Sequence, residues 1–292
     1  MSPESGPSTP SGGRDGGDRD GRTALTVVIT ATRVESELAS DALWQLGAAA
    51  VQETERHDGR VDLRAALGED RVDLTRRLAD CRYPWRFEEM DLSVAETWRR
   101  FVSIIDVSPG LRVVPAWLED STSDATADDI SLRIEPGPTF GLGTHATTRL
   151  CLRALQSRVV EGDRVLDVGT GTGILAIASV RLGAHRAVAI DINPASPAVV
   201  KANAAANGVA ELVDASLEPL SSIHDSFDVV VANILAPVIR ELSADIVRLA
   251  RRCIVLSGLL AARYNEVLAT MAPWRVREVL EEEGWAAVIL ER

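Results

Sequence analysis

Hydrophobic and polar residues follow two different periods along residues 24–93. Short runs with strand-like patterning alternate with two stretches of helical spacing, and in one of these Leu38, Ala42 and Leu46 share a helix face. The pattern predicts the order β-α-β-β-α-β, which is typical of a small ferredoxin-like α+β domain. The expected strands cover residues 25–30, 48–53, 61–66 and 85–92, and the expected helices cover residues 35–46 and 72–78.

From residue 111 onward, short and almost wholly apolar runs alternate with amphipathic stretches. Such runs are typical of parallel strands buried on both faces, so the pattern predicts an α/β domain. The last two strands surround residues 282–284 and form an antiparallel hairpin, which departs from a dinucleotide-binding sheet. The expected strands cover residues 111–117, 130–136, 164–167, 186–190, 211–217, 227–232, 253–257, 274–280 and 285–290, and the expected helices cover residues 147–155, 174–182, 198–207, 238–250 and 259–271.

Two further segments complete the expected domain organisation. Residues 1–23 are rich in Ser, Gly, Pro, Asp and Arg, which is the composition of a disordered tail. The pattern of residues 94–110 predicts a connecting helix and linker. The expected domains are therefore residues 24–93 and 111–292. Because the first of them lacks a catalytic constellation, we expect it either to recognise a substrate or only to stabilise the chain.

Composition narrows the class of protein. The net charge is −12 and the pI is about 4.9, which disfavours general binding to a nucleic acid backbone and suits a basic protein partner. No apolar run reaches the roughly 18 residues of a membrane helix, and the N-terminus lacks the apolar region of a signal peptide. Cys81, Cys151 and Cys253 have neither a disulfide nor a zinc spacing. We therefore expect a soluble cytoplasmic protein without a metal site.

A glycine-rich turn is the central motif of the larger domain. Gly169, Gly171 and Gly173 follow an apolar run that ends in Asp167, and a helical pattern begins directly after them. Without side chains in this turn, a ligand can lie against the backbone, and Asp167 can face a positively charged ligand. The spacing differs from the dinucleotide fingerprint, whose last glycine comes one residue later. A dinucleotide site and a glycine turn without a ligand stay open as alternatives here.

Three polar residues stand beside this turn in the predicted topology. Asp191 ends the next strand, 20 residues after Gly171, where a carboxylate reaches ribose hydroxyls in such folds; otherwise it caps a helix. Asn233 ends a central strand, and its carbonyl can accept a hydrogen bond from an amine or cap the following helix. His145 lies in a loop with two glycines before a helix. Three roles stay open for it: a base, a contact to the ligand, or a hydrogen-bonding residue of the loop.

Six motifs in this order resemble those of the ribosomal protein L-eleven (L11) methyltransferase family. The resemblance covers residues 24–292 and is strong from Val113 onward. Leu142 and Ala146 depart from it, because family members commonly carry Thr and Pro at these two places. The motifs are Val114-Pro-Ala-Trp117, Phe140-Gly-x-Gly-Thr-His-x-Thr-Thr148, Leu166-Asp-Val-Gly-Thr-Gly-Thr-Gly173, Ala189-Ile-Asp191, Val231-Ala-Asn-Ile-Leu-Ala236 and Leu256-Ser-Gly-Leu259.

The resemblance implies a class I transferase that depends on S-adenosylmethionine (SAM). Such an enzyme has a Rossmann-like sheet that ends in an antiparallel hairpin, and it methylates lysine and N-terminal amino groups of ribosomal protein L11. Its small N-terminal domain docks that substrate. Open alternatives are methylation of another protein or a small molecule on the same scaffold, a non-catalytic SAM-binding module associated with the ribosome, and a dinucleotide-dependent oxidoreductase.

The resemblance also implies roles for particular residues. It places Thr148, Gly169, Asp191 and Asn233 at the SAM site, to which the glycine turn adds Gly171 and Gly173, with Asp167 near the positive end of SAM. Asn233 and His145 are the catalytic candidates, with His145 as the candidate base. No metal is implied.

Overall fold

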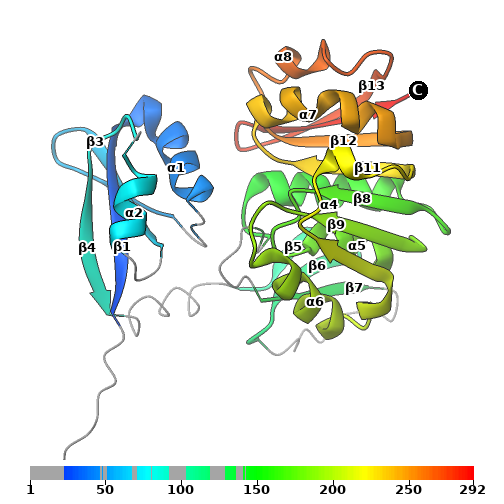
Figure 1. Ribbon diagram of the computed structural model, residues 1–292, viewed down its shortest axis with the longest axis horizontal. Helices are drawn as coiled ribbons and strands as arrows, with labels where there is room; N and C mark the ends of the chain where they lie inside the picture. Colours follow the sequence, from blue (N-terminus) through cyan, green and yellow to red (C-terminus); the bar gives the residue numbers. More distant parts are fainter. Residues whose placement is uncertain are drawn as a thin grey trace, which may run out of the picture.

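The computed structural model describes residues 23–46, 48, 51–67, 71–79, 81–91, 103–118, 129–135, 141 and 143–292. Within this part of the chain, the strands form one sheet of four, one of three and one of seven (Figure 1). The expected tail, most of the expected connecting helix and most of the expected loop after residue 118 lie outside the described residues.

The four-stranded sheet has the predicted element order β-α-β-β-α-β (Figure 1, blue to cyan). Apolar residues of both helices, among them Leu43 and Leu74, pack on Ile29 and Leu63 of the sheet. The second strand starts later than expected, because the N–H of Ala48 still donates to the carbonyl of Leu43 at the end of the first helix, 3.1 Å away. The elements are β1 (Thr23–Thr32), α1 (Ser36–Gln45), β2 (Gln52–Glu55), β3 (Arg60–Ala66), α2 (Arg71–Arg77) and β4 (Trp85–Asp91), with the sheet order β2-β3-β1-β4.

The seven-stranded sheet has the order β10-β9-β8-β11-β12-β14-β13. Its first five strands are parallel, and β14 runs antiparallel to β12 and forms the expected terminal hairpin with β13. The order reverses direction between β8 and β11, which is where open α/β sheets bind ligands. The strands are β8 (Arg164–Val168), β9 (Arg186–Ile190), β10 (Val213–Ser216), β11 (Phe227–Asn233), β12 (Ala250–Leu260), β13 (Arg275–Glu282) and β14 (Trp285–Glu291).

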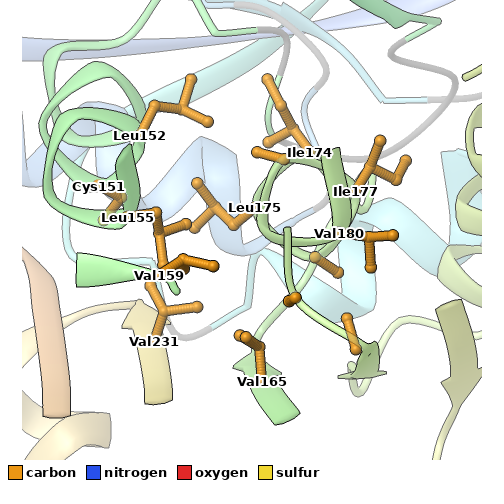
Figure 2. Packing of buried hydrophobic residues seen from close by; sticks show 14 of the residues in the cluster. Cys151, Leu152, Leu155, Val159, Val165, Ile174, Leu175, Ile177, Val180 and Val231 are labelled. Carbon is orange, nitrogen blue, oxygen red and sulfur yellow. The ribbon is translucent and has the colours of Figure 1, made fainter. Parts of the chain in front are cut away.

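Successive side chains of the central strand β11 enter two separate hydrophobic layers. Val229 and Val231 belong to one cluster, and Val230 and Ala232 belong to the other, as the two-residue period of a strand dictates. The first cluster includes Leu155 and other apolar residues of α4 and α5 (Figure 2). The helices of the first layer are α4 (Ala146–Arg158), α5 (Ile174–Arg181) and α6 (Ser196–Ala206), and those of the second are α7 (Ala236–Leu249) and α8 (Asn265–Leu268).

The three-stranded sheet consists of β5 (Ile105–Ser108), β6 (Leu111–Pro115) and β7 (Ile130–Ile134). Its β5 falls inside the range expected for the linker, so the strands of this sheet begin before residue 111. The sheet joins the core of the larger domain through buried residues such as Val113 and Leu132.

Two asparagines, Asn203 of α6 and Asn207 at its C-cap, attach this sheet to the larger domain. The side-chain amide of Asn207 accepts from the N–H of Arg133 (2.9 Å) and donates to its carbonyl (2.7 Å), and Asn203 does the same with Glu135 at 2.9 Å each. Each amide therefore pairs with β7 or its end as a neighbouring strand would. Asn203 also donates to the carbonyl of Thr172 in the glycine turn, 3.0 Å away, so one side chain joins β7 to the turn.

The prediction of a helix over residues 259–271 is wrong. Strand β12 continues to Leu260, where Leu259 and Leu260 pair with Ala286 and Trp285 of β14, and only residues 265–268 are helical. The buried positions in this stretch fit a helix as well as a strand end. Pairing with the hairpin decides between them, and a local pattern does not contain that information.

We expect Asn203→Ala to lower the free energy of unfolding by about 2–4 kcal/mol, because it removes three hydrogen bonds, which the amide makes with the N–H and carbonyl of Glu135 and with the carbonyl of Thr172. Urea denaturation would measure this loss. Asn265→Ala is the matched control, because this exposed asparagine starts the short helix α8. Equal losses in the two variants would contradict a structural role for the Asn203 amide.

Candidate functional site

A cavity of about 560 Å³ lies at the carboxyl ends of the strands, on both sides of the switch point. This volume is within the range of small-molecule and cofactor sites. Its walls come from the segments that follow four parallel strands, together with the start of α4 and the start of β14. The lining residues include His145, Thr147, Val168, Gly169, Gly171, Asp191, Ile192, Leu217, Glu218, Asn233, Ile234, Leu235, Val238, Asp245, Gly258 and Trp285.

The three glycines of the turn have different functions in the structure. Gly169 and Gly171 line the cavity with φ angles of 75° and 56°, and a Cβ on Gly169 would lie 2.3 Å from Cγ2 of Ile234. Gly173 does not line the cavity. It is the N-cap of α5 with a φ of 84°, and a Cβ there would lie 2.8 Å from Cγ1 of Val200 on α6. The first two therefore form the cavity wall, and the third allows two helices to pack closely.

Asp191 lies on the wall of the cavity and is tied to the glycine turn. Its Oδ2 accepts from the N–H of Gly171 (2.7 Å), and its Oδ1 accepts from the N–H of Asn193 (2.8 Å). Each carboxylate oxygen can accept a second hydrogen bond. Asp191 does not cap the following helix, because the N-cap of α6 is Ala195. The two hydrogen bonds fix its carboxylate in the cavity wall and leave it able to accept further hydrogen bonds.

Asp167 lies beneath the turn and not in the cavity wall. Its side chain is fully buried, and its Oδ2 accepts from Oγ1 of Thr170 (2.6 Å) and from the N–H of Ala176 (3.1 Å). Its Oδ1 is buried without a hydrogen-bond partner. Burial raises the pKa of this carboxyl to about 7 against the opposing effect of these two hydrogen bonds, and the charge of Asp191 raises it further. Asp167 therefore supports the turn, in place of the direct ligand contact that we expected.

Asn233 lies in the cavity wall at the end of β11, with Thr148 behind it. The Nδ2 of Asn233 is 3.5 Å from Oγ1 of Thr148, and Thr148 is almost fully buried. Among the described residues, none donates to the Oδ1 of Asn233. The N-cap of α7 is Leu235, so Asn233 does not cap that helix. Thr148 does not reach the cavity, whereas its neighbour Thr147 does, so the expected contact at Thr148 becomes a support for Asn233.

His145 is the N-cap of α4 and also lines the cavity. Its Nδ1 accepts from the N–H of Thr147 (3.3 Å) and lies 2.8 Å from the Oγ1 of the same residue. Burial lowers the pKa of His145, the charge of Arg149 lowers it further, and Glu283 acts in the opposite direction. The ring is therefore neutral at pH 7, and Nδ1 is the acceptor that the cap needs. This cap geometry agrees with the expected role of His145 as a loop hydrogen-bonder.

Trp285 is a cavity residue that the sequence motifs do not indicate. It begins β14, and its indole lies edge-to-face with the ring of His145 at a centroid distance of 5.1 Å and an interplanar angle of 66°. These residues are 140 positions apart in the sequence. A tryptophan after the turn of a terminal hairpin is only a weak signal for a cavity, because tryptophan at such a place is also common in a hydrophobic core.

The charged side chains that line the cavity are all acidic. Asp191, Glu218 and Asp245 line it, and neither Lys nor Arg is among its lining residues in the described part of the chain. Such a wall attracts a cationic ligand and repels a pyrophosphate. The described residues contain no group of three or more His, Cys, Asp or Glu that could hold a metal ion, and no described helix is long and apolar enough to cross a membrane.

Comparison with known proteins identifies the family. The family model for ribosomal protein L11 methyltransferase (PrmA) matches residues 86–292. A ribosomal protein L11 methyltransferase of Symbiobacterium thermophilum is 38% identical over 213 residues, which are 71% of this chain and 67% of that protein. One from Anoxybacillus flavithermus is 35% identical over 203 residues, or 68% and 64%. The matched part thus spans about two thirds of the length of these relatives.

A solved structure supports the same assignment. The crystal structure of ribosomal protein L11 methylase from Lactobacillus delbrueckii subsp. bulgaricus matches with a TM-score of 0.61 and 30% identity, covering 65% of this chain and 99% of that chain. The chain belongs to the ribosomal protein L11 methyltransferase family. The family resemblance and the predicted Rossmann-like methyltransferase fold are therefore confirmed, and membership in this family argues against a dinucleotide-dependent oxidoreductase.

We expect Asp167→Asn to remove a pH dependence of stability. A carboxyl pKa of about 7 in the folded protein, against about 4 in the unfolded chain, means that the folded protein binds this proton more tightly. The wild type should therefore lose stability as pH rises from about 4 to 7, by about 2–4 kcal/mol relative to the variant. Urea denaturation across this range measures the difference, with the exposed Asp106→Asn as control. Parallel curves for wild type and Asp167→Asn would contradict the raised pKa.

Proposed function

We propose that this protein transfers methyl groups from SAM to amino groups of ribosomal protein L11, at lysine side chains and the N-terminal amine. The observation that carries the proposal is the acidic cavity at the switch point, with Asp191 and Asn233 in its wall, in a chain that belongs to this family. The substrate would place the reaction in the cytoplasm.

The residues around the cavity fit SAM. The backbone at Gly169 and Gly171 can lie against its methionine part, and Asp191 can accept from the two ribose hydroxyls. Apolar side chains are exposed on the same wall: Ile192 is 99% exposed and Leu217 48%. Exposed apolar groups in a hollow mark a ligand surface, and the flat adenine ring can cover them. The acidic lining suits the positive charges of the sulfonium and the ammonium.

Methyl transfer needs positioning more than covalent chemistry from the chain. When bound, SAM supplies an electrophilic methyl group on sulfur, and the reaction is an in-line displacement by an amine lone pair. We assign to the Oδ1 of Asn233 the acceptance of a hydrogen bond from the amine or from the methionine end of SAM, with Thr148 holding the amide. Val168 and Trp285 provide an apolar wall that limits water.

The accepting amine must lose a proton before it reacts. A free lysine has a pKa near 10.4, and burial in an apolar mouth lowers it. Because the Nδ1 of His145 caps α4, we assign His145 to the loop and the proton to solvent. Removal of the proton by solvent asks less of the site than a built-in base does, since a lysine that is already deprotonated needs no base at the moment of transfer.

We further propose that residues 24–93 are the recognition domain for the protein substrate. A second cavity of about 500 Å³ is lined by Leu38, Ala42 and Leu46 at α1 and by residues of the larger domain. Leu235, Gly258 and Trp285 line both cavities. A substrate segment held beside α1 would thus have a direct approach to the first cavity. Of the two residues that depart from the family's usual pattern, Ala146 begins α4 and is buried, and Leu142 lies outside the described residues.

The test is methylation of purified ribosomal protein L11 with methyl-labelled SAM, followed by mass spectrometry. We expect labelled methyl groups on amines. Asp191→Ala should weaken SAM binding by about 1–3 kcal/mol in calorimetry, because charge-assisted hydrogen bonds are lost. Gly171→Leu should abolish binding, because its side chain would fill the cavity.

Other outcomes separate the alternatives. Label on another protein or small molecule, with none on L11, would change the substrate. SAM binding without transfer to any acceptor would indicate a non-catalytic module. Unchanged SAM affinity in both folded variants would remove the proposed site.

We expect Asn233→Ala to lower kcat more than SAM affinity, because orientation of the reacting groups matters most in the transition state. His145→Ala should weaken SAM binding while the pH–rate profile keeps its shape. Rates measured across pH with saturating SAM provide the check. A loss of about 100-fold with a flattened profile in His145→Ala would instead make this residue the base. Full activity in both variants would contradict this placement of the amine.

A further inference from the structure

Arg149 joins three segments that are distant in the sequence. Its Nε donates to Oε1 of Glu282 at the end of β13 (2.7 Å), and its guanidinium donates to Oε1 of Glu283 in the hairpin turn (2.8 Å). The same guanidinium donates to the carbonyl of Thr144, just before α4. One side chain thus connects the loop before α4, the first turns of α4 and the tip of the terminal hairpin.

This connection is partly buried and made by charged groups. The side chain of Arg149 is 13% exposed and that of Glu282 is 20% exposed. Arg153 adds a second donor, at 2.6 Å from Oε2 of Glu282. Burial alone would raise the pKa of Glu282, but the hydrogen bonds and charges of the two arginines outweigh it and lower the pKa. A shielded two-arginine network stabilises a fixed geometry better than an exposed pair does.

The hairpin turn carries strain where it meets Arg149. Glu283 has a φ of 52° and Gly284 a φ of 81°, which is the pattern of a two-residue type I′ turn. Such turns favour Asn at the first of these positions, and a side chain such as Glu costs about 1–2 kcal/mol in this conformation. The carboxylate of Glu283 is the group that reaches Arg149. A residue such as Asn at position 283 would fit the turn better but would lose the contact with Arg149.

The hairpin tip carries the aromatic wall of the cavity. Glu282 stands directly opposite Trp285 in the hairpin register, so a fixed Glu282 restrains the backbone of Trp285. The indole of Trp285 packs edge-on against His145, and Trp285 lines both cavities. It therefore lies where an amine that enters from the second cavity would meet the first.

We propose that Arg149, with Glu282 and Glu283, latches the hairpin tip to the start of α4 and so positions Trp285 beside the accepting amine. Arg149 is thus a positioning residue for methyl transfer, because it acts through Trp285 and lines neither cavity. This inference rests on the proposed methyltransferase function. A displacement of about 1 Å at the reacting groups can cost about 100-fold in rate, so loss of the latch should appear mainly in kcat.

The test compares Arg149→Met with Arg158→Met in the full-length protein. Arg158 also joins α4 to β13, through Glu278 at 2.6 Å, but it lies far along the helix from the hairpin tip. We expect Arg149→Met to lower kcat by about 10- to 100-fold, with SAM affinity within about twofold of wild type. Arg158→Met should lose comparable stability and keep its kcat. Arg149→Lys should restore part of the rate, because Lys keeps the charge but not the planar fork.

Glu283→Asn separates stability from function. Asn suits the left-handed turn, so the free energy of unfolding should stay equal or rise, while kcat falls by about two- to fivefold because one latch contact is lost. A purely structural turn would give no loss of kcat. Unchanged kcat in Arg149→Met, or an equal loss of kcat in Arg158→Met, would overturn the latch.

A fluorine spectrum tests the latch without a methyl acceptor. In protein labelled with 5-fluorotryptophan, the resonance absent from Trp285→Phe identifies Trp285. It should shift or broaden in Arg149→Met and stay in place in Arg158→Met. If L11 accepts no methyl group, this spectrum still decides the latch, so the two proposals can fail separately. An unmoved Trp285 resonance in Arg149→Met would overturn the inference.

Discussion

The site depends on a close approach of backbones around Ile234, just past the end of β11. A Cβ on Gly169 would lie 2.3 Å from a methyl carbon of Ile234, and a Cβ on Gly258 would lie 2.4 Å from its carbonyl oxygen. Side chains at these two positions would push apart the carboxyl ends of β8, β11 and β12. Because both glycines also have positive φ angles, the strand ends can close around Ile234 and place Asn233 in the cavity wall.

Buried side chains behind the cavity hold its wall in place. Asp167 binds the glycine turn from below, Thr148 holds the amide of Asn233, and Asn203 joins the turn to β7. None of these three lines the cavity. The wall is therefore supported by rigid neighbours on each side, as an orienting site requires. Its acidic lining also agrees with the chain's net charge of −12, so the local and overall fields both favour a cationic ligand.

The cavity also joins the two halves of the proposed reaction. The cofactor would lie along the glycine turn and Asp191, whereas the amine would arrive past Trp285 from the side of α1. The start of α4 contributes to both sides, because His145 caps this helix and Arg149 reaches the hairpin. The start of α4 thus contacts both the hairpin beside the proposed substrate entrance and the wall of the proposed cofactor site.

The sequence by itself determined the order of most elements, the fold class and the wall residues Gly169, Gly171, Asp191 and Asn233. These features depend on local spacing and on the rule that parallel strands end at one edge. Only the tertiary structure decided that Asp167 and Thr148 lie behind the wall, because burial depends on packing by distant segments. It likewise decided that residues 259–260 extend β12, and that Trp285 meets His145 from 140 positions away. Such contacts join residues that no local period relates.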